Sequence, residues 1–321
     1  MSIAWQFYIS SILVYLGVDV MACWGLNLQF GVTGIMNFAY IVFQAAGAYT
    51  AAILTLGPSS RSLFQHYIGG ANLPFPIPII AAGAVGALLS LVVGTFTLRR
   101  LRVDYQAMVM LIVSLIAINV ATNQVDLVNG SAGLSLVPKP LSQVLNLDLV
   151  NYQWFYVALT AVVCVIVFLF VHQVTRSPLG RTLRAIRDNE HSAAALGKNV
   201  TRFRLLAFVL GGAIAGVSGA ILVEFIGTWA PGSWTYAETF VLFTAIIVGG
   251  TGNNLGVAVG ALLVPVVFLE ATRFLPPIGY PGLIDALQWV AVGLLALLFL
   301  WRWPRGVIPE RRRRFRKPAP G

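Results

Sequence analysis

Hydrophobic stretches of about 20 residues alternate with short polar segments along almost the whole chain. Nine stretches can be delimited, at residues 9–26, 35–56, 77–98, 106–124, 153–172, 204–226, 237–250, 255–275 and 283–301. Most are long enough for a helix to cross a hydrocarbon core of about 30 Å, and the strict alternation typical of β-strands is absent. The pattern predicts an all-α polytopic membrane protein with about nine transmembrane spans.

The seventh stretch is short and runs into the glycine-rich sequence VGGTGNNLG, residues 248–256. Glycine disfavours a continuous helix, so residues 237–250 and 255–275 are expected to form a tight hairpin or a partly broken pair. A similar glycine- and asparagine-rich sequence, GLNLQFGVTG, occupies residues 25–34 after the first stretch. This likeness suggests two weakly related halves.

Composition excludes a water-soluble globular protein. Hydrophobic residues make up 58% of the chain, charged residues only 10%, and the mean hydropathy is +0.83. No 321-residue soluble domain could bury so much apolar surface. We therefore expect residues 1–321 to form a single transmembrane domain.

The basic residues indicate how the chain is oriented. If the C-terminus is cytoplasmic, nine spans place the N-terminus outside, and 18 of the 21 lysines and arginines fall on or beside the inner segments. The three others are Arg61, Lys139 and Arg273. This asymmetry follows the positive-inside rule, so the net charge of +10 reflects topology and is not interpreted as nucleic-acid binding. The basic tail, residues 302–321, is expected in the cytosol, where it could contact anionic lipid.

The inner segment 173–204 is the longest polar interruption in the second half of the chain. A Pro-Leu-Gly turn at residues 178–180 is expected to lead into one short helix. Gly197 is expected to end that helix as its C′ residue, with Lys198 beside it. The segment is interpreted as the part of a membrane protein that contacts something in the cytosol.

Motifs for metal binding and nucleotide hydrolysis are missing from the sequence. It contains no HExxH motif and no paired cysteines, and its three histidines are expected on different loops and helix ends. The nearest approach to a phosphate-binding loop, Gly197-Lys198-Asn199, lacks the hydroxyl residue and the preceding strand. We predict no metal site, no catalytic residue and no cofactor in this chain.

One enzymatic alternative concerns residues 216–219, which read Gly-Val-Ser-Gly. This sequence resembles the GxSG motif around the nucleophile of intramembrane serine proteases of the rhomboid type. Those enzymes use a histidine on a later helix as base, and no histidine follows Ser218. We favour a packing role, in which Gly212, Gly216 and Gly219 let helices approach closely.

The stretch 25–52 is the most suggestive for transport. Polar side chains surround Gly31 and Gly34, so the backbone there is expected to be irregular, which is tolerated at membrane depth only against protein or a water-filled cavity. We predict that the translocation path is lined by the polar and aromatic residues Asn27, Gln29, Thr33, Asn37, Phe43 and Gln44.

Three stretches together carry a family resemblance. They are residues 25–52, residues 176–222 with the sequence RSPLGRTLRAIRDNEHSAAALGKNVTRFRLLAFVLGGAIAGVSGAIL, and residues 246–264 with IIVGGTGNNLGVAVGALLV. The combination resembles the LivM-type permease subunit of bacterial branched-chain amino-acid ABC importers, over about residues 25–300. The proline-rich segment 73–78 and the basic stretch 311–317 are not part of the resemblance.

The resemblance implies a role for the inner segment 173–204 as a cytosolic coupling loop with a coupling helix. In that family the helix carries a degenerate E-x-x-A-A-x-x-G signature and docks on an ATPase subunit. The residues expected to contact the ATPase are Arg181, Arg184, Arg187, Asp188, Glu190, Ala193, Ala194 and Gly197.

The resemblance also implies partners and a location. The partners would be a second, LivH-type permease subunit, two ATPase subunits that bind the ATP, and an extracytoplasmic substrate-binding protein. The chain would lie in the bacterial cytoplasmic membrane and line the path by alternating access. A secondary transporter or channel for small polar solutes, working without an ATPase, remains the alternative function.

Overall fold

The computed structural model describes residues 3–58, 65–101, 103–142, 147–269, 271 and 283–310. A helix lies within each of the nine predicted stretches, and the described residues contain no strand beyond two isolated bridges. These helices are α1 (Ile3–Gln29), α2 (Tyr40–Thr55), α3 (Ile77–Arg100), α4 (Val103–Asn123), α7 (Leu149–Arg176), α10 (Val200–Ile226), α11 (Tyr236–Gly249), α12 (Asn254–Ala261) continued by η3 (Leu262–Phe268), and α14 (Leu283–Arg302). Short helices α5 (Val125–Val128), η1 (Gly130–Ala132) and η2 (Pro231–Ser233) lie in connecting segments.

The predicted count of nine full spans is not confirmed. Five helices among the described residues are long and apolar enough to cross a membrane, namely α1, α3, α4, α7 and α10. At 1.5 Å per residue, α2 and α11 reach only about 24 Å and 21 Å, less than a hydrocarbon core of about 30 Å. The chain is a multi-pass membrane protein, in which neither α2 nor α11 is by itself long enough to cross that core.

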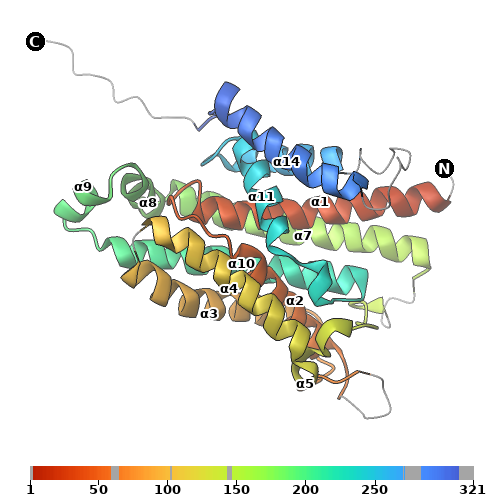
Figure 1. Cartoon of the computed structure of the whole chain (residues 1–321). Helices are drawn as coiled ribbons and strands as arrows, with labels where there is room; N and C mark the ends of the chain where they lie inside the picture. The colour runs from red at the N-terminus through yellow and green to blue at the C-terminus, as the bar shows by residue number, and fades with distance from the viewer. Residues whose placement is uncertain are drawn as a thin grey trace, which may run out of the picture.

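Helix α10 forms the centre of the bundle and packs against α1, α2 and α3 (Figure 1). Its small residues make this possible. A Cβ added to Gly216 would overlap the carbonyl oxygen of Ala82 in α3, and one added to Gly219 would overlap that of Gln44 in α2. Since lipid supplies no hydrophobic drive between helices, such close backbone contact is what holds them together. The predicted packing role of these glycines is confirmed.

Helices α11 and α12 form the predicted tight hairpin. A Cβ on Gly249 would overlap the carbonyl oxygen of Gly256, and one on Gly260 would overlap that of Ala245. After Ala261 the helix widens into the π-helical segment η3, which contains Pro265. Proline has no N–H for the hydrogen-bond ladder, which explains why the regular helix stops there. The last residues of the predicted span 255–275 lie outside the described residues.

The connection between α1 and α2 is irregular, as predicted. Residues 30–39 contain no regular helix, and Gly34 has φ of +79°. The Asn37 side chain accepts a hydrogen bond from the Ala39 backbone N–H at 3.0 Å. Because this local turn competes with helix formation, α2 begins at Tyr40 and not at residue 35 as predicted.

Two short helices, α8 (Pro178–Asp188) and α9 (Glu190–Ala195), occupy the inner segment 173–204. Figure 1 shows them at the end of the bundle away from the start of α1, beyond the ends of the long helices. The predicted single helix is therefore wrong, because Asn189 adopts an extended conformation that separates the two. The predicted Pro-Leu-Gly turn is also wrong. Pro178 is the first residue of α8, where its fixed φ and missing N–H suit a helix start.

The outer helices α7 and α14 present apolar side chains away from the bundle. Val162, Ile166 and Leu169 of α7 are more than half exposed, as are Leu294 and Leu297 of α14. Such a surface would be an aggregation hazard in water but is ordinary in contact with lipid. It supports the assignment as a multi-pass membrane protein.

Candidate functional site

The elbow formed by α8 and α9 is built by a series of side-chain caps. Ser177 accepts a hydrogen bond from the Gly180 N–H at 3.4 Å, Asn189 from the Ser192 N–H at 2.9 Å, and Asn199 from the Arg202 N–H at 3.1 Å. Each cap satisfies a backbone donor that the first turn of a helix leaves free. The sequence thus defines three helix starts, those of α8, α9 and α10, within a short stretch of chain.

Gly197 ends α9 as predicted. Its φ is +76°, its N–H donates to Ala194 O at 2.9 Å, and the Lys198 N–H donates to Ala193 O at 3.2 Å. This is the Schellman arrangement, in which a left-handed residue closes the helix. A Cβ on Gly197 would have nothing within 4 Å, so within this chain glycine is needed for its conformation and not for space.

The inner face of the elbow is apolar. Leu183 packs on Leu28 of α1 and Ala207 of α10, while Ile186 and Ala193 pack on Val200 at the start of α10. Ala193, predicted as an ATPase contact, is only 4% exposed. Its side chain faces the protein interior and cannot be reached by a partner while the elbow stays closed.

The outer face of the elbow is accessible. Among the predicted coupling residues, Arg181, Asp188, Glu190, Ala194 and Gly197 are exposed. Leu196, which the sequence prediction did not include, is 80% exposed at the tip of α9. Leu196 could have been identified from the sequence, because it is an isolated leucine in a polar segment. The Leu196 side chain is therefore available for contact with a partner.

Four of the predicted coupling residues, Arg184, Arg187, Asp188 and Glu190, form ion pairs within the chain. The carboxylate of Glu310 lies 2.6 Å from Arg184 Nε and 2.9 Å from Arg187 Nη2. Glu190 of α9 lies 3.2 Å from Arg204 Nη1 of α10. Glu310 was missed, although it is the only acidic residue from residue 302 onward in the sequence, among eight basic ones.

The residues predicted to line a path are buried, and the polar ones form a hydrogen-bond network. Asn27 Oδ1 accepts from the Gly252 N–H at 2.9 Å, and Asn27 Nδ2 donates to Asn254 Oδ1 at 3.4 Å. Gln29 donates to Phe208 O at 2.7 Å and accepts from Asn37 Nδ2 at 2.8 Å.

The remaining predicted path residues are packed in the same way. Thr33 Oγ1 donates to Leu28 O at 2.8 Å. Phe43 is fully buried edge-on against Phe208, and Gln44 is 4% exposed. The network joins the loop after α1 to the α11–α12 turn, so the two glycine- and asparagine-rich sequences of the chain meet in space. Its groups are paired with protein in this conformation.

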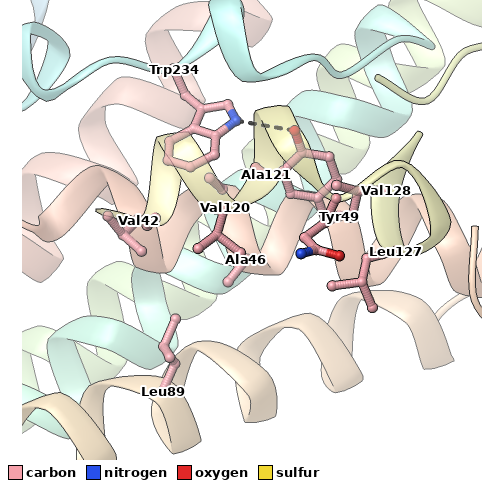
Figure 2. Close-up of a pocket in the computed structure, with 12 residues that line it drawn as sticks. Val42, Ala46, Tyr49, Leu89, Val120, Ala121, Leu127, Val128 and Trp234 are labelled. Atoms are coloured by element: carbon pink, nitrogen blue, oxygen red, sulfur yellow. Dashed lines mark hydrogen bonds between the residues drawn. The ribbon is translucent and has the colours of Figure 1, made fainter. Parts of the chain in front are cut away.

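An apolar cavity of about 220 Å³ lies between α2 and α4. Val42, Ala46 and Tyr49 of α2 form one wall, and Val120 and Ala121 of α4 form the other (Figure 2). Trp234 Nε1 donates to the Tyr49 hydroxyl at 3.3 Å, as Figure 2 shows, so the two rings hold each other at the edge of the cavity. Trp234 belongs to no motif in the sequence, so its place at the cavity could not have been predicted.

Ser218 of the GxSG sequence lies fully buried in α10. Its Oγ donates to Ala215 O, 2.8 Å away, in the same helix. No group of three histidine, cysteine or carboxylate side chains within the described part of the chain could hold a metal ion. The geometry around Ser218 is that of helix packing.

Comparison with known proteins identifies the family. Residues 8–301 match the family model described as the permease component of the branched-chain amino acid transport system. No solved structure matches the chain.

Among curated proteins, the chain is 28% identical to the probable branched-chain amino acid transport permease protein LivM of Methanocaldococcus jannaschii, covering 94% of each chain. It is 30% identical to the high-affinity LivM permease protein of Salmonella typhimurium, over 97% of this chain and 73% of that protein. It is also 26% identical to the LivH permease protein of the same organism, over 78% of this chain and 80% of that one. The chain therefore belongs to the family of permease components of branched-chain amino acid transport systems, which are membrane transport subunits and not enzymes.

Proposed function

We propose that this chain is the LivM-type transmembrane subunit of an ABC importer that carries branched-chain amino acids across the bacterial cytoplasmic membrane. Its partners would be a LivH-type permease, two ATPase subunits that bind the ATP, and an extracytoplasmic binding protein. Family membership and the names of the relatives support this assignment. The observation that carries the mechanism is the α8–α9 elbow, which projects from the bundle as a capped, rigid unit with an exposed apolar tip.

Coupling follows from this geometry. ATP binding closes the two ATPase subunits, and a subunit docked on the outer face of α9 would move the elbow as one body. The buried contacts of Leu183 and Ile186 would carry that movement to α1 and α10. The outward-facing residues Arg181, Asp188, Glu190, Ala194 and Gly197 would meet the ATPase, whereas Arg184, Arg187 and Ala193 would act from inside the elbow.

The proposed orientation places the α8–α9 elbow and the segment after α14 in the cytosol. The charge distribution supports it, because inner segments attract lysine and arginine and the α8–α9 elbow is rich in arginine. The start of α1 would then lie outside.

The apolar cavity beside α2 is proposed as the place that receives the hydrophobic side chain of the transported amino acid. Its walls offer almost only hydrocarbon, and the polar atoms of Tyr49 and Trp234 are bonded to each other. Such a lining suits an aliphatic side chain but cannot pair the charged amino and carboxyl groups, which would have to be held elsewhere along the path.

The cavity is tested by Ala121→Phe, which fills it and should lower the rate of leucine uptake. Ala84→Phe, on the exposed face of α3, is the control. Normal uptake by Ala121→Phe would show that the cavity does not receive the side chain of the transported amino acid.

The test of the function is reconstitution. The chain is co-expressed with a LivH-type permease and two ATPase subunits, placed in proteoliposomes, and assayed for leucine uptake with and without ATP and binding protein. We expect uptake only when both are present. Uptake that needs no ATPase would favour a secondary transporter or channel.

The coupling surface is tested by Leu196→Asp in the same complex. Because Leu196 makes no buried contact, we expect the thermal stability of the permease to be unchanged while binding of the ATPase subunits weakens about tenfold or more. Leu136→Asp is the matched control, since Leu136 is 77% exposed in the segment between α5 and α7. Equal ATPase binding by the two variants would contradict the assignment of the elbow.

A further inference from the structure

The segment that follows α14, residues 303–310, is docked on the turn between α11 and α12. The Val307 N–H donates to Val248 O at 2.8 Å and the Ile308 N–H donates to Gly249 O at 3.0 Å. Asn253 Nδ2 donates to the carbonyls of Ile308 and Pro309, both at 3.2 Å. Four hydrogen bonds thus tie the end of the described chain to a turn more than 50 residues earlier.

Glycine is required on both sides of this contact. A Cβ on Gly250 would overlap Ile308 O, and Gly250 has φ of +121°. On the opposite side, Gly306 has φ of +67°, and a Cβ there would lie 2.5 Å from Gly250 Cα. The fit excludes any larger residue at either position, so the docking is a specific feature of the fold.

The docked segment delivers Glu310 to α8. Its two carboxylate oxygens meet different arginines, Arg184 at 2.6 Å and Arg187 at 2.9 Å. Arg187 also donates through Nη1 to the carbonyl oxygen of Gly31, in the loop after α1. The Glu310 carboxylate lies over the α11–α12 turn as well, because a Cβ on Gly252 would lie 2.9 Å from Glu310 Oε2.

Glu310 provides most of the negative charge that compensates Arg184 and Arg187. Within the described part of the chain, the only other acidic partner of either arginine is Asp188, 3.5 Å from Arg187 and 71% exposed. The three side chains of the clamp are 21–30% exposed, so solvent weakens these ion pairs without removing them. One carboxylate shared by two arginines has more geometric specificity than a single surface pair. Without Glu310, Arg184 would have no acidic partner among the described residues and Arg187 would keep only Asp188.

We propose that Glu310 is a positioning residue for energy coupling, which clamps α8 to the loop after α1 and to the α11–α12 turn so that the three move as one body. This proposal rests on the proposed function of the elbow. A displacement of α8 would then move the loop after α1 and the α11–α12 turn together. The ion pairs of Glu310 would transmit it in addition to the apolar contacts of the elbow. The positioning acts through Arg184 and Arg187, not through contact with the transported molecule.

The first test measures coupling in the reconstituted four-subunit complex. With Glu310→Gln, we expect ATP hydrolysis to continue while leucine molecules imported per ATP hydrolysed fall about fivefold, the effect of losing roughly one ion-pair energy. Arg202→Gln is the matched control. Arg202 is an exposed basic residue in the first turn of α10 and has no ion pair among the described residues. A wild-type ratio in Glu310→Gln would overturn the proposal.

The second test detects the clamp without transport. Spin labels are attached at Ala185→Cys on α8 and Leu255→Cys on α12, both exposed positions, in the same complex after Cys23 and Cys164 have been replaced by alanine. Glu310→Gln should lengthen and broaden the distance distribution, and Arg202→Gln should not. An unchanged distribution would refute the clamp even if transport were impaired. If the wild-type complex shows no ATP-driven uptake, the proposed function is wrong. The spin-label distances still test whether Glu310 holds α8 against the α11–α12 turn.

Discussion

At the scale of single residues, burial separates side chains that hold the fold from those that could meet a partner. The polar residues of the α1–α2 connection looked like path-lining groups in the sequence, yet their hydrogen bonds join α1 to α10 and to the α11–α12 turn. Buried amides paired in this way are expensive to disturb, because loss of one partner leaves the other unsatisfied. A stabilising role and a transport role for these residues therefore predict different experimental results.

Asn27→Ala should destabilise the protein by about 1–3 kcal/mol, since it leaves the Gly252 N–H and Asn254 Oδ1 without their partner. The measurement is the thermal unfolding midpoint in detergent. Asn119→Ala is the control, because the Asn119 side chain is exposed and its hydrogen bond among the described residues is to Leu115 O in its own helix. A changed KM for uptake with an unchanged midpoint would instead favour a path role for Asn27.

Gly216→Leu should destabilise the bundle by about 1–3 kcal/mol or prevent its assembly, because the new side chain would overlap the backbone of α3. Expression level and the thermal midpoint report the effect. Gly293→Leu is matched to it, being a glycine within α14 with nothing within 4 Å of its added Cβ. Similar stability in the two variants would show that the helices can separate at no cost.

At the scale of elements, the α8–α9 elbow illustrates how local chemistry defines a mechanical part. Three capping side chains and one left-handed glycine give it fixed ends, and the apolar inner face fixes its position on α1 and α10. A lever needs this stiffness, since a flexible loop would absorb movement instead of transmitting it. The backbone at Gly197 is the most sensitive point, because a β-branched residue is strained at positive φ.

Gly197→Val should fray the end of α9 and lower the number of substrate molecules imported per ATP by several-fold, as strain of about 1–2 kcal/mol at this position opposes the closed turn. Gly197→Asn should retain most of the coupling, because asparagine tolerates the left-handed conformation. Both variants are assayed in the reconstituted complex. If asparagine were as harmful as valine, the reason would be close approach of the ATPase and not the backbone conformation.

At the scale of the whole molecule, one long central helix is surrounded by long helices and shorter elements that pair through glycine. Helix α10 touches α1, α2 and α3, while the short α11–α12 hairpin is tied to α1 by Asn27 and to the last described segment by Asn253. The elbow and the docked segment 303–310 gather at one end. The proposed function requires that this end face the cytosol.

Sidedness is tested with single cysteines in a background without Cys23 and Cys164. Leu196→Cys should react with a membrane-impermeant maleimide in inverted vesicles only, and Leu136→Cys in right-side-out vesicles only, since the two positions lie in the elbow and in the segment between α5 and α7. Both leucines are highly exposed, so accessibility to reagent is not limiting. The reverse pattern would refute the orientation and with it the coupling role of the elbow.

The sequence by itself determined the class, the approximate position of every long helix, the α11–α12 hairpin, the packing glycines and the glycine that ends α9. These features depend on local patterns: apolar length, glycine content and residues that favour particular backbone angles. It also supported the family assignment through three stretches of sequence. It located the polar segment 173–204 between two long helices, although it predicted one helix where Asn189 separates two.

Only the tertiary structure decided which of the predicted site residues are free to act. Ala193 points inward, Arg184 and Arg187 bind a glutamate from the far end of the chain, and Asn27 and Gln29 pair with residues well over 100 positions away. Periodicity and propensity report what neighbours along the chain can do. Contacts between distant segments depend on how helices are brought together, and this is why Glu310 at the clamp and Trp234 at the cavity emerged from the packed molecule alone.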